Sequence, residues 1–221
     1  MPKTHTVKQG EHMAGIVCQY GFEDYKPVWE DGANADLKGR RKNPNVLSPG
    51  DQLTIPDREQ KEYDRPTDNK HRFKLHRTAL KLRVELEELY GKVLGGTEYV
   101  LTTGGQCHRD TTTGAGIVEQ PLGKQDIRAT LAFAETLTVK GQAVKLERKL
   151  DLLIGHLDPV DQRSGQEARL ANLGYYFYEQ SDDDSEFESA VEEFQCDNGI
   201  APVTGQCDGT TIAALLKAHG C

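Results

Sequence analysis

The sequence has no apolar run that approaches the roughly 20 residues needed to cross a bilayer as a helix. It also lacks the apolar core of a signal peptide, because Met1-Pro2-Lys3 leads directly into a strand-like run. We therefore expect the chain to be made in the cytoplasm, to have no general export signal of its own, and to have no membrane partner.

A surplus of positive charge is missing too. The 221 residues carry a formal net charge of -8, which disfavours nonspecific binding to nucleic acids or to anionic membranes. We expect no nucleic-acid partner. A soluble chain of this length typically divides into about one to three small domains.

Metal-binding motifs are absent from the cysteine pattern. No C-x-x-C pair occurs, and the odd number of cysteines leaves at least one thiol free in any disulfide scheme. The cysteines are Cys18, Cys107, Cys196, Cys207 and Cys221. Cys18 adjoins an apolar pair on a predicted helix and is expected to be a small buried side chain, while Cys196 and Cys207 flank one loop and could pair in an oxidising compartment. We predict no metal and no cofactor.

No catalytic constellation is recognisable either. The sequence has no His-Glu-x-x-His helix, and His71 and His76, five residues apart in a predicted strand, fall on opposite faces. Cys107 and His108 are neighbours in a turn-rich stretch, where adjacent side chains diverge, so they do not suit a nucleophile and its base. We therefore predict that the protein is not an enzyme.

What the sequence does contain is a short α+β pattern at residues 5–56. Residues 6–8 alternate like a half-buried strand, and Gly10 allows the chain to reverse into a helix that Gly21 ends. Residues 25–36 indicate a second helix entered at Pro27. After the turn at residues 49–50, Leu53 and Ile55 face one side of a returning strand. The pattern predicts a β-α-α-β unit over residues 1–57.

This unit resembles a LysM module. The residues that match the LysM pattern in type and order are Val7, Gly10, Ile16, Tyr20, Gly21, Asn45, Leu47, Pro49, Gly50, Leu53, Ile55 and Pro56. Such modules bind the N-acetylglucosamine-containing glycan of cell walls in a shallow groove between the loop after the first strand and the loop before the last. The resemblance implies a groove formed by Gly10, Glu11, His12, Asn45, Leu47 and Ser48.

The link before the last strand, residues 34–45, is longer and more basic than in an ordinary LysM module. Two interpretations are open. The basic residues 38–42 could form a recognition loop for an acidic partner, or the segment could be a solvated extension that prolongs the second helix.

Residues 58–70 are charged and rich in helix breakers, which predicts a linker. From residue 71 to 155, alternating runs at residues 71–77, 80–86, 99–103, 116–119, 127–133 and 144–150 predict strands of a small antiparallel β-sandwich. Residues 90–101 and 111–118 resemble the prealbumin-like β-sandwich that occurs as a regulatory domain beside carboxypeptidases. This resemblance implies a fold and no chemistry.

Residues 156–221 predict a third unit of three helices. The first ends at Gly174, the second covers residues 186–198 with an apolar stripe at i, i+3, i+4 and i+7, and the third follows Asp208 as its cap. Residues 169–175, 190–195, 198–200, 203–205 and 211–215 resemble the three-helix peptidoglycan-binding domain that accompanies many wall hydrolases. The resemblance implies weak glycan contacts at Tyr175 and Tyr176. The acidic stretch at residues 180–187 is expected to be a solvated loop, with a divalent-ion loop as the alternative.

The sequence thus predicts an α+β multidomain protein: a LysM-like unit, a β-sandwich and a peptidoglycan-binding-like unit. This combination resembles proteins found beside the spike proteins of type VI secretion and related contractile injection systems. Two hypotheses follow. The protein could bind peptidoglycan glycan strands without catalysis, delivered to the periplasm or outside by such an apparatus; or it could be a structural adaptor whose LysM-like and helical units dock spike or baseplate proteins instead of glycan.

Overall fold

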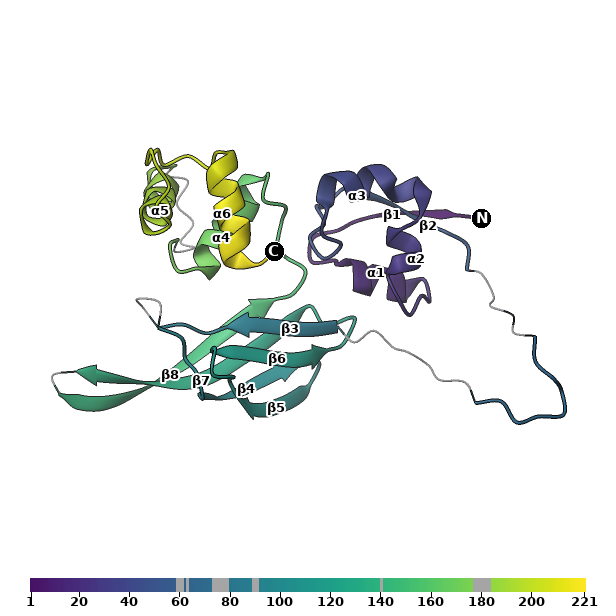
Figure 1. Ribbon diagram of the computed structural model, residues 1–221, viewed down its shortest axis with the longest axis horizontal. Coiled ribbons are helices and arrows are strands. Elements are labelled where there is room, and N and C mark those ends of the chain that lie inside the picture. Colours follow the sequence, from purple (N-terminus) through teal and green to yellow (C-terminus); the bar gives the residue numbers. More distant parts are fainter. Residues whose placement is uncertain (59–61, 63, 73–79, 89–91, 140, 177–183) are drawn as a thin grey trace.

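The computed structural model describes residues 1–58, 62, 64–72, 80–88, 92–139, 141–176 and 184–221. Within these residues the chain forms six α-helices, one 3-10 helix and three antiparallel sheets, which confirms the predicted α+β class. Figure 1 shows three groups of elements: a purple N-terminal unit, a teal β-unit and a yellow-green helical unit. No helix in the described part of the chain is long and apolar enough to span a membrane.

The N-terminal unit (residues 3–55) is a two-stranded antiparallel sheet with helices between its strands. β1 (Lys3–Thr6) pairs with β2 (Gln52–Ile55). Between them lie α1 (Met13–Gln19), α2 (Lys26–Trp29), the 3-10 helix η1 (Gly32–Asn34) and α3 (Ala35–Arg41). These elements bury one apolar core, composed of Val7, Met13, Ile16, Val17, Val28, Trp29, Leu37, Leu47, Leu53 and Ile55.

The prediction of one continuous helix over residues 25–36 is wrong. The side chain of Asp31 accepts a hydrogen bond from the backbone of η1 (2.8 Å), which starts a new short helix after α2. The buried Asn34 amide donates to the carbonyls of Val28 (2.8 Å) and Thr54 (2.7 Å) and accepts from the Thr54 N–H (2.8 Å). Because short polar side chains compete with the helix for backbone groups, these bonds interrupt the helix and tie it to β2.

The basic link at residues 34–45 is largely helical, since α3 ends only at Arg41. Lys38 forms an ion pair with Glu30, and the guanidinium of Arg41 donates to the carboxylate of Asp51. These cations are therefore held by carboxylates of the same unit. The link therefore forms a separate helix, α3, and is neither an open recognition loop nor a direct prolongation of the second helix.

The β-unit (residues 80–153) has two antiparallel sheets that share one core. β3 (Leu80–Glu85) pairs with β6 (Ile117–Leu122), and a second sheet has the order β5-β4-β7-β8. Its strands are β4 (Glu98–Thr103), β5 (Gln106–Thr111), β7 (Arg128–Val139) and β8 (Gln142–Leu153). The buried residues of the core are Leu86, Leu94, Tyr99, Leu101, Val118, Ala129 and Leu131.

β7 and β8 pair over their full length, but β4 pairs only with residues 129–133 of β7. The far half of this two-stranded ribbon therefore extends beyond the rest of the sheet (Figure 1). One sequence prediction changes here. Cys107 and His108 lie in β5 and not in a turn, because Gly104 and Gly105, both at positive φ, complete a two-residue turn and let the strand resume at once. The strand predicted over residues 71–77 falls largely on residues outside the described ranges.

The C-terminal unit (residues 163–219) consists of α4 (Arg163–Asn172), α5 (Asp184–Asp197) and α6 (Gly209–His219). Asp208 accepts from the Thr211 N–H (2.8 Å), which confirms it as the predicted cap of α6. Of the acidic stretch at 180–187, residues 180–183 lie outside the described part, and the rest begins α5, where acids complement the helix dipole. The core of the unit is Leu170, Phe187, Ala190, Val191, Phe194 and Leu215.

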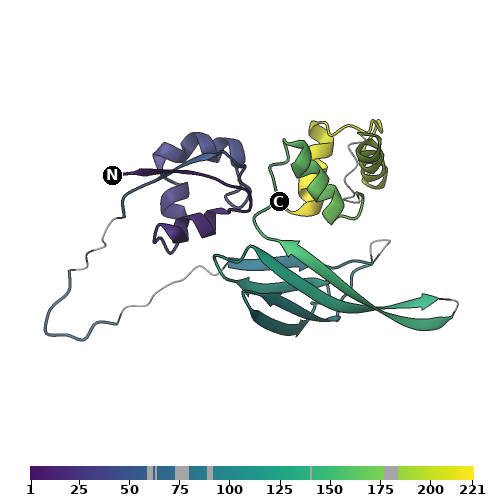
Figure 2. The same cartoon turned by 180° about the vertical axis from the view of Figure 1, so that it is seen from behind.

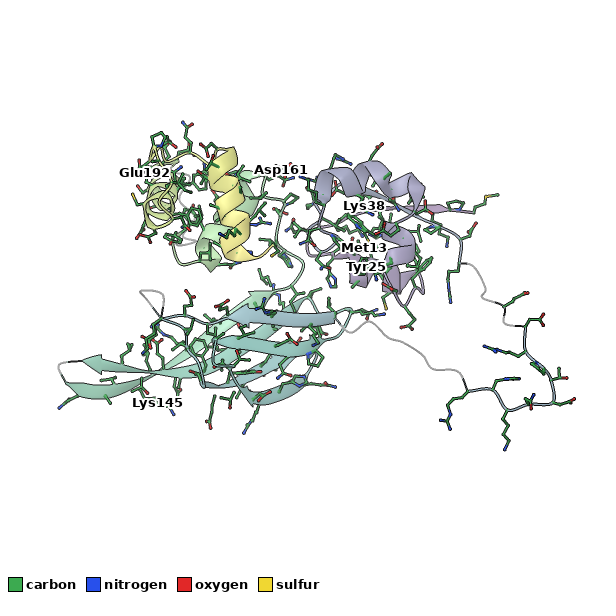
Figure 3. The ribbon with its side chains drawn as sticks, viewed as in Figure 1. Met13, Tyr25, Lys38, Lys145, Asp161 and Glu192 are labelled. Carbon is green, nitrogen blue, oxygen red and sulfur yellow. The ribbon has the colours of Figure 1, made fainter. Side chains whose placement is uncertain are left out.

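All five cysteines are free thiols, so the optional pairing of Cys196 with Cys207 is not formed. Cys18 is partly exposed, which differs from the predicted full burial. Figures 1 and 2 show the N-terminal and C-terminal units side by side above the β-unit, with the chain from β8 to α4 running between them. Figure 3 places Asp161 on the side of the C-terminal unit that faces the N-terminal unit.

Candidate functional site

The first half of the predicted glycan groove is the turn that joins β1 to α1. Gly10 has a φ of 85°, a conformation that favours glycine. His12 caps α1: its Nδ1 accepts a hydrogen bond from the Gly15 N–H (3.4 Å), and its side chain is buried. Burial lowers the pKa of His12, which keeps the ring neutral and able to accept this bond.

Glu11, in the same turn, is held by its own unit. Its Oε2 accepts from the Lys8 N–H (2.9 Å) and contacts Nε2 of His5 (2.9 Å), and Nδ1 of His5 lies 3.1 Å from the Tyr20 hydroxyl. Burial raises the pKa of Glu11, but the bonds from His5 and Lys8 lower it by more, so it lies below its ordinary value. The carboxylate therefore holds the turn in shape.

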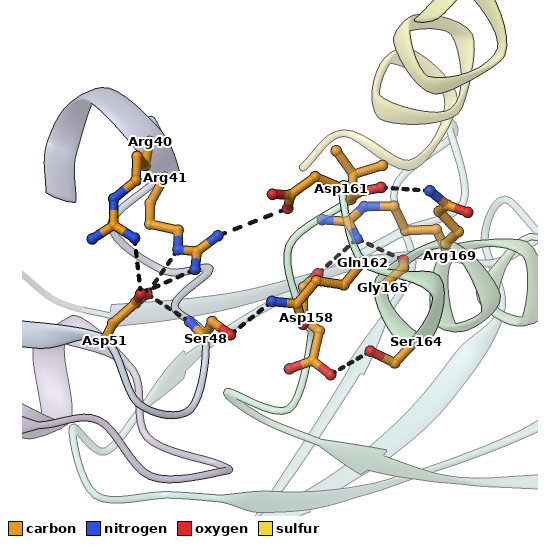
Figure 4. Close-up of polar contacts among 12 residues, drawn as sticks. Arg40, Arg41, Ser48, Asp51, Asp158, Asp161, Gln162, Ser164, Gly165 and Arg169 are labelled. Carbon is orange, nitrogen blue, oxygen red and sulfur yellow. Dashed lines mark hydrogen bonds and ion pairs between the residues drawn. The ribbon is translucent and has the colours of Figure 1, made fainter. Parts of the chain in front are cut away.

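The second half of the groove is the loop before β2, where Asp51 organises the backbone. Its carboxylate accepts from the Ser48 N–H (2.9 Å) and from two nitrogens of Arg41 (2.7 and 3.0 Å), as Figure 4 shows. Burial raises the pKa of Asp51, but the bonds from Arg41 and Ser48 and the charges of Arg41 and Arg40 lower it by more. Asp51 is therefore ionised and holds Ser48 in place.

The structure places the predicted loop residues in three different settings. Leu47 is 4% exposed and belongs to the apolar core, so its side chain does not face the groove. Ser48 is buried, and its hydroxyl accepts from Nε2 of Gln162 (2.8 Å). Asn45 is exposed and lines a shallow cavity of about 260 Å³ with Tyr25, Lys81 and Lys124, on the side of the β-unit.

Residues 155–162, which join β8 to α4, lie against both halves of the groove; we call them the covering segment. At Gly10, a β-carbon would lie 2.7 Å from Nε2 of His156, and at Gly155 a β-carbon would lie 2.7 Å from the carbonyl oxygen of Gly10. At the other end, Gln162 bonds Ser48. The predicted groove residues Gly10, His12 and Ser48 are thus brought together under one segment of the same chain.

The C-terminal candidates Tyr175 and Tyr176 adjoin each other where α4 ends, and both pack partly on the core. The ring of Tyr175 meets Phe194 edge-on (5.4 Å between centroids), and its hydroxyl donates to Asp197 (3.1 Å). Burial and the Asp197 carboxylate raise the pKa of Tyr175 to about 12. Tyr176 meets Phe187 edge-on at 6.4 Å. Because both rings pack partly on the core, only part of each ring face of Tyr175 and Tyr176 is accessible to a ligand.

The residues that the sequence did not indicate are Asp51, which organises the loop before β2, and three residues that join the units: His156, Asp161 and Gln162. No local pattern marks them, because their partners lie up to 147 residues away, as with the bond from Gln9 to the His156 carbonyl (3.5 Å). Among the residues that the structure describes, no group of three or more His, Cys, Asp or Glu side chains could hold a metal ion.

Residues 155–215 match the family model described as "Putative peptidoglycan binding domain". The match begins at the covering segment and runs through α4 and α5 into α6. It bears out the predicted C-terminal peptidoglycan-binding-like unit and supports a peptidoglycan-binding role for it. No curated protein and no solved structure matches the chain.

Proposed function

We propose that this chain is a non-catalytic protein that binds the N-acetylglucosamine-containing glycan strands of peptidoglycan. The single observation that carries the proposal is the family match at residues 155–215. In that region Leu170, Phe194 and Leu215 are fully buried at the centre of a three-helix core. Tyr175 and Tyr176, at the end of α4, are the side chains we assign to weak sugar contact.

We propose further that the N-terminal unit is a LysM-type module that adds a second glycan site. The order β1, α1, α2, α3, β2 and the tight turn at Gly10 support this. Two weak sites on one chain suffice for retention. A binding free energy of about 4 to 8 kcal/mol at each site corresponds to a millimolar to micromolar dissociation constant. Because the two sites are linked, the effective concentration of the second site raises the overall avidity.

The experiment is a pull-down of the full chain with purified peptidoglycan sacculi. The unmodified chain is expected to be retained. Asn45→Ala removes the exposed amide among the predicted groove residues, and if that amide binds sugar the change is expected to weaken retention roughly two- to tenfold, the loss of one hydrogen bond of about 0.5–1.5 kcal/mol. Asn69→Ala, an exposed amide in the linker, is the matched control. Absence of retention for the unmodified chain would contradict the proposed function.

A second candidate function is that of a structural adaptor, whose LysM-like and helical units dock proteins instead of glycan. The observation that favours it is the covering segment, which already places protein against Gly10 and Ser48. Because the combination of units resembles proteins found beside spike proteins of type VI secretion systems, we propose association with such an apparatus under either function. Co-purification with spike or baseplate proteins, with no retention on sacculi, is the result that would favour the adaptor.

A further inference from the structure

The covering segment (residues 155–162) makes polar contacts in two directions. Toward its own unit, Arg169 donates to the Asp158 carbonyl (2.9 Å), and the Ser164 hydroxyl donates to the Asp158 carboxylate (2.8 Å). The Arg169 side chain is also buried and donates to the carbonyls of Gly165 and Cys221. The segment is therefore anchored to the C-terminal unit.

Toward the N-terminal unit, the contact at the Gly10 turn depends on the absence of side chains. Gly155 has a φ of 77° and Gly10 a φ of 85°, and a β-carbon on either would come within 2.7 Å of the other segment. The ring of His156 lies over Gly10, and a β-carbon on Gly155 would also come within 3.2 Å of the His12 ring. The close approach of two glycines at positive φ brings backbone against backbone, as a peptide does in a binding groove.

At the loop before β2, the contacts are polar and few. Nε2 of Gln162 donates to the Ser48 hydroxyl (2.8 Å), and the carboxylate of Asp161, whose side chain is 73% exposed, lies 3.7 Å from Arg41 (Figure 4). Gln162 thus presents a primary amide to the groove. An N-acetyl group of a sugar carries the same amide chemistry, with one N–H donor and one carbonyl acceptor.

We infer that the covering segment and an N-acetylglucosamine oligomer compete for the surface formed by Gly10, His12 and Ser48. In the arrangement described here, the segment occupies that surface, so a glycan binds the N-terminal unit only after Gln162 and His156 withdraw. This inference rests on the proposed function. Because the segment is anchored to α4 by Arg169, its withdrawal separates the N-terminal unit from the C-terminal unit and couples the two glycan sites.

The test compares three full-length proteins by titration with a soluble oligomer of N-acetylglucosamine, which carries no peptide. The double variant His156→Ala/Gln162→Ala removes the covering side chains. The matched control His108→Ala/Gln142→Ala removes the same residue types from β5 and β8 of the β-unit. If the open arrangement is about one tenth populated, the first variant is expected to bind roughly tenfold more tightly than the unmodified chain, and the control is expected to be unchanged.

Asp161→Ala protects the test against a folding artefact, because this exposed residue can be changed without opening the core. It is expected to tighten binding in the same direction by a smaller factor. Hydrogen exchange supplies a second readout: in the unmodified chain, the oligomer is expected to speed exchange of the amides of residues 155–162 while it slows exchange near Gly10.

If all the proteins bind the oligomer with the same dissociation constant, the covering segment does not compete with the glycan. The proposed function is not contradicted by that result. Slower exchange in residues 155–162 on addition of the oligomer would likewise overturn it, since the segment would then form part of the site. If no protein binds the oligomer, both the competition and the glycan site of the N-terminal unit are wrong, whereas retention on sacculi still reports separately on the C-terminal unit.

Discussion

Asp51 is the side chain on which the loop before β2 depends most. It is 5% exposed and accepts three hydrogen bonds, two from Arg41 and one from the Ser48 backbone. Arg41 also faces Asp161 of the covering segment. The Asp51 carboxylate therefore holds Arg41 at the end of α3 and the backbone of Ser48. Through Arg41 it also positions the positive charge that faces the covering segment.

Replacement of Asp51 by Asn is expected to lower the free energy of unfolding of the N-terminal unit by about 3 kcal/mol at neutral pH, because Arg41 then stays buried without its counter-charge. The pKa of Asp51 is lowered in the folded state, so its stabilisation is complete above about pH 4, the unfolded value, and is lost as the pH falls through the folded pKa. Urea unfolding at several pH values measures both effects.

The control for this prediction is Asp64→Asn, an exposed carboxylate in the linker. It is expected to leave stability within about 0.5 kcal/mol of the unmodified chain, as for most surface changes. A variant at Asp51 that keeps the full acid dependence of the unmodified chain would show that another group causes it.

At the scale of single residues, the sequence predicted those whose role is local. Gly10 and Gly21 have the positive φ that a turn and a helix end require, and Asp208 caps α6. It misplaced Leu47, because the family pattern fixes the order of residues but not which side of the loop each one faces. It could not find Gln162, since its partner Ser48 lies 114 residues away.

At the scale of elements, hydrophobic periodicity predicted α1, α4, α5, α6 and several strands, because these elements bury one apolar face. Hydrophobic periodicity did not predict the places where hydrogen bonds from side chains determine where a helix ends. The break between α2 and α3 follows from Asn34, which bonds the backbone of β2. Strand β5 was missed because it is polar and mostly exposed, so it carries no alternation.

The loop from α5 to α6 offers a test at this scale. Gln195 is fully buried, and its amide bonds the hydroxyls of Thr204 and Thr211, the Gln206 carbonyl, and the N–H groups of Thr204 and Gly205. Gln195→Leu keeps the approximate volume but leaves these groups without partners. We expect a loss of about 3 kcal/mol in the free energy of unfolding of the C-terminal unit.

The matched control is Gln206→Leu, whose side chain is exposed and whose carbonyl remains in place. Denaturant unfolding of both variants makes the comparison. If Gln206→Leu lowers the free energy of unfolding as much as Gln195→Leu does, the buried amide of Gln195 does not organise the loop.

At the scale of the whole molecule, the described residues form three separate apolar cores joined by few polar contacts. The N-terminal unit meets the covering segment at Ser48 and the β-unit where Lys124 reaches Glu23. Small polar contacts of this kind do not make domains unfold together. The sequence predicted units of this kind, but it held no signal for how they contact one another.

Scanning calorimetry is therefore expected to show more than one transition. Gln195→Leu is expected to lower only the transition of the C-terminal unit, by roughly 10 °C or more, since each kcal/mol shifts a unit of this size by about 4–8 °C. One transition that moves as a whole in this variant would show instead that the contacts between units are strong enough to couple all three cores.

The β7–β8 ribbon has a consequence for the behaviour of the protein in concentrated solution. β8 is the outer strand of its sheet, so the backbone groups along its outer side, over a strand of twelve residues, are a template for another strand. Lys145, Glu147, Lys149 and Asp151 stand on one face of that strand, exposed and alternating in sign. Because like charges directly opposite each other are destabilising, these side chains disfavour the antiparallel alignments with a second β8 that place Lys145 opposite Lys149, and so they limit the ways in which the edge can add strands.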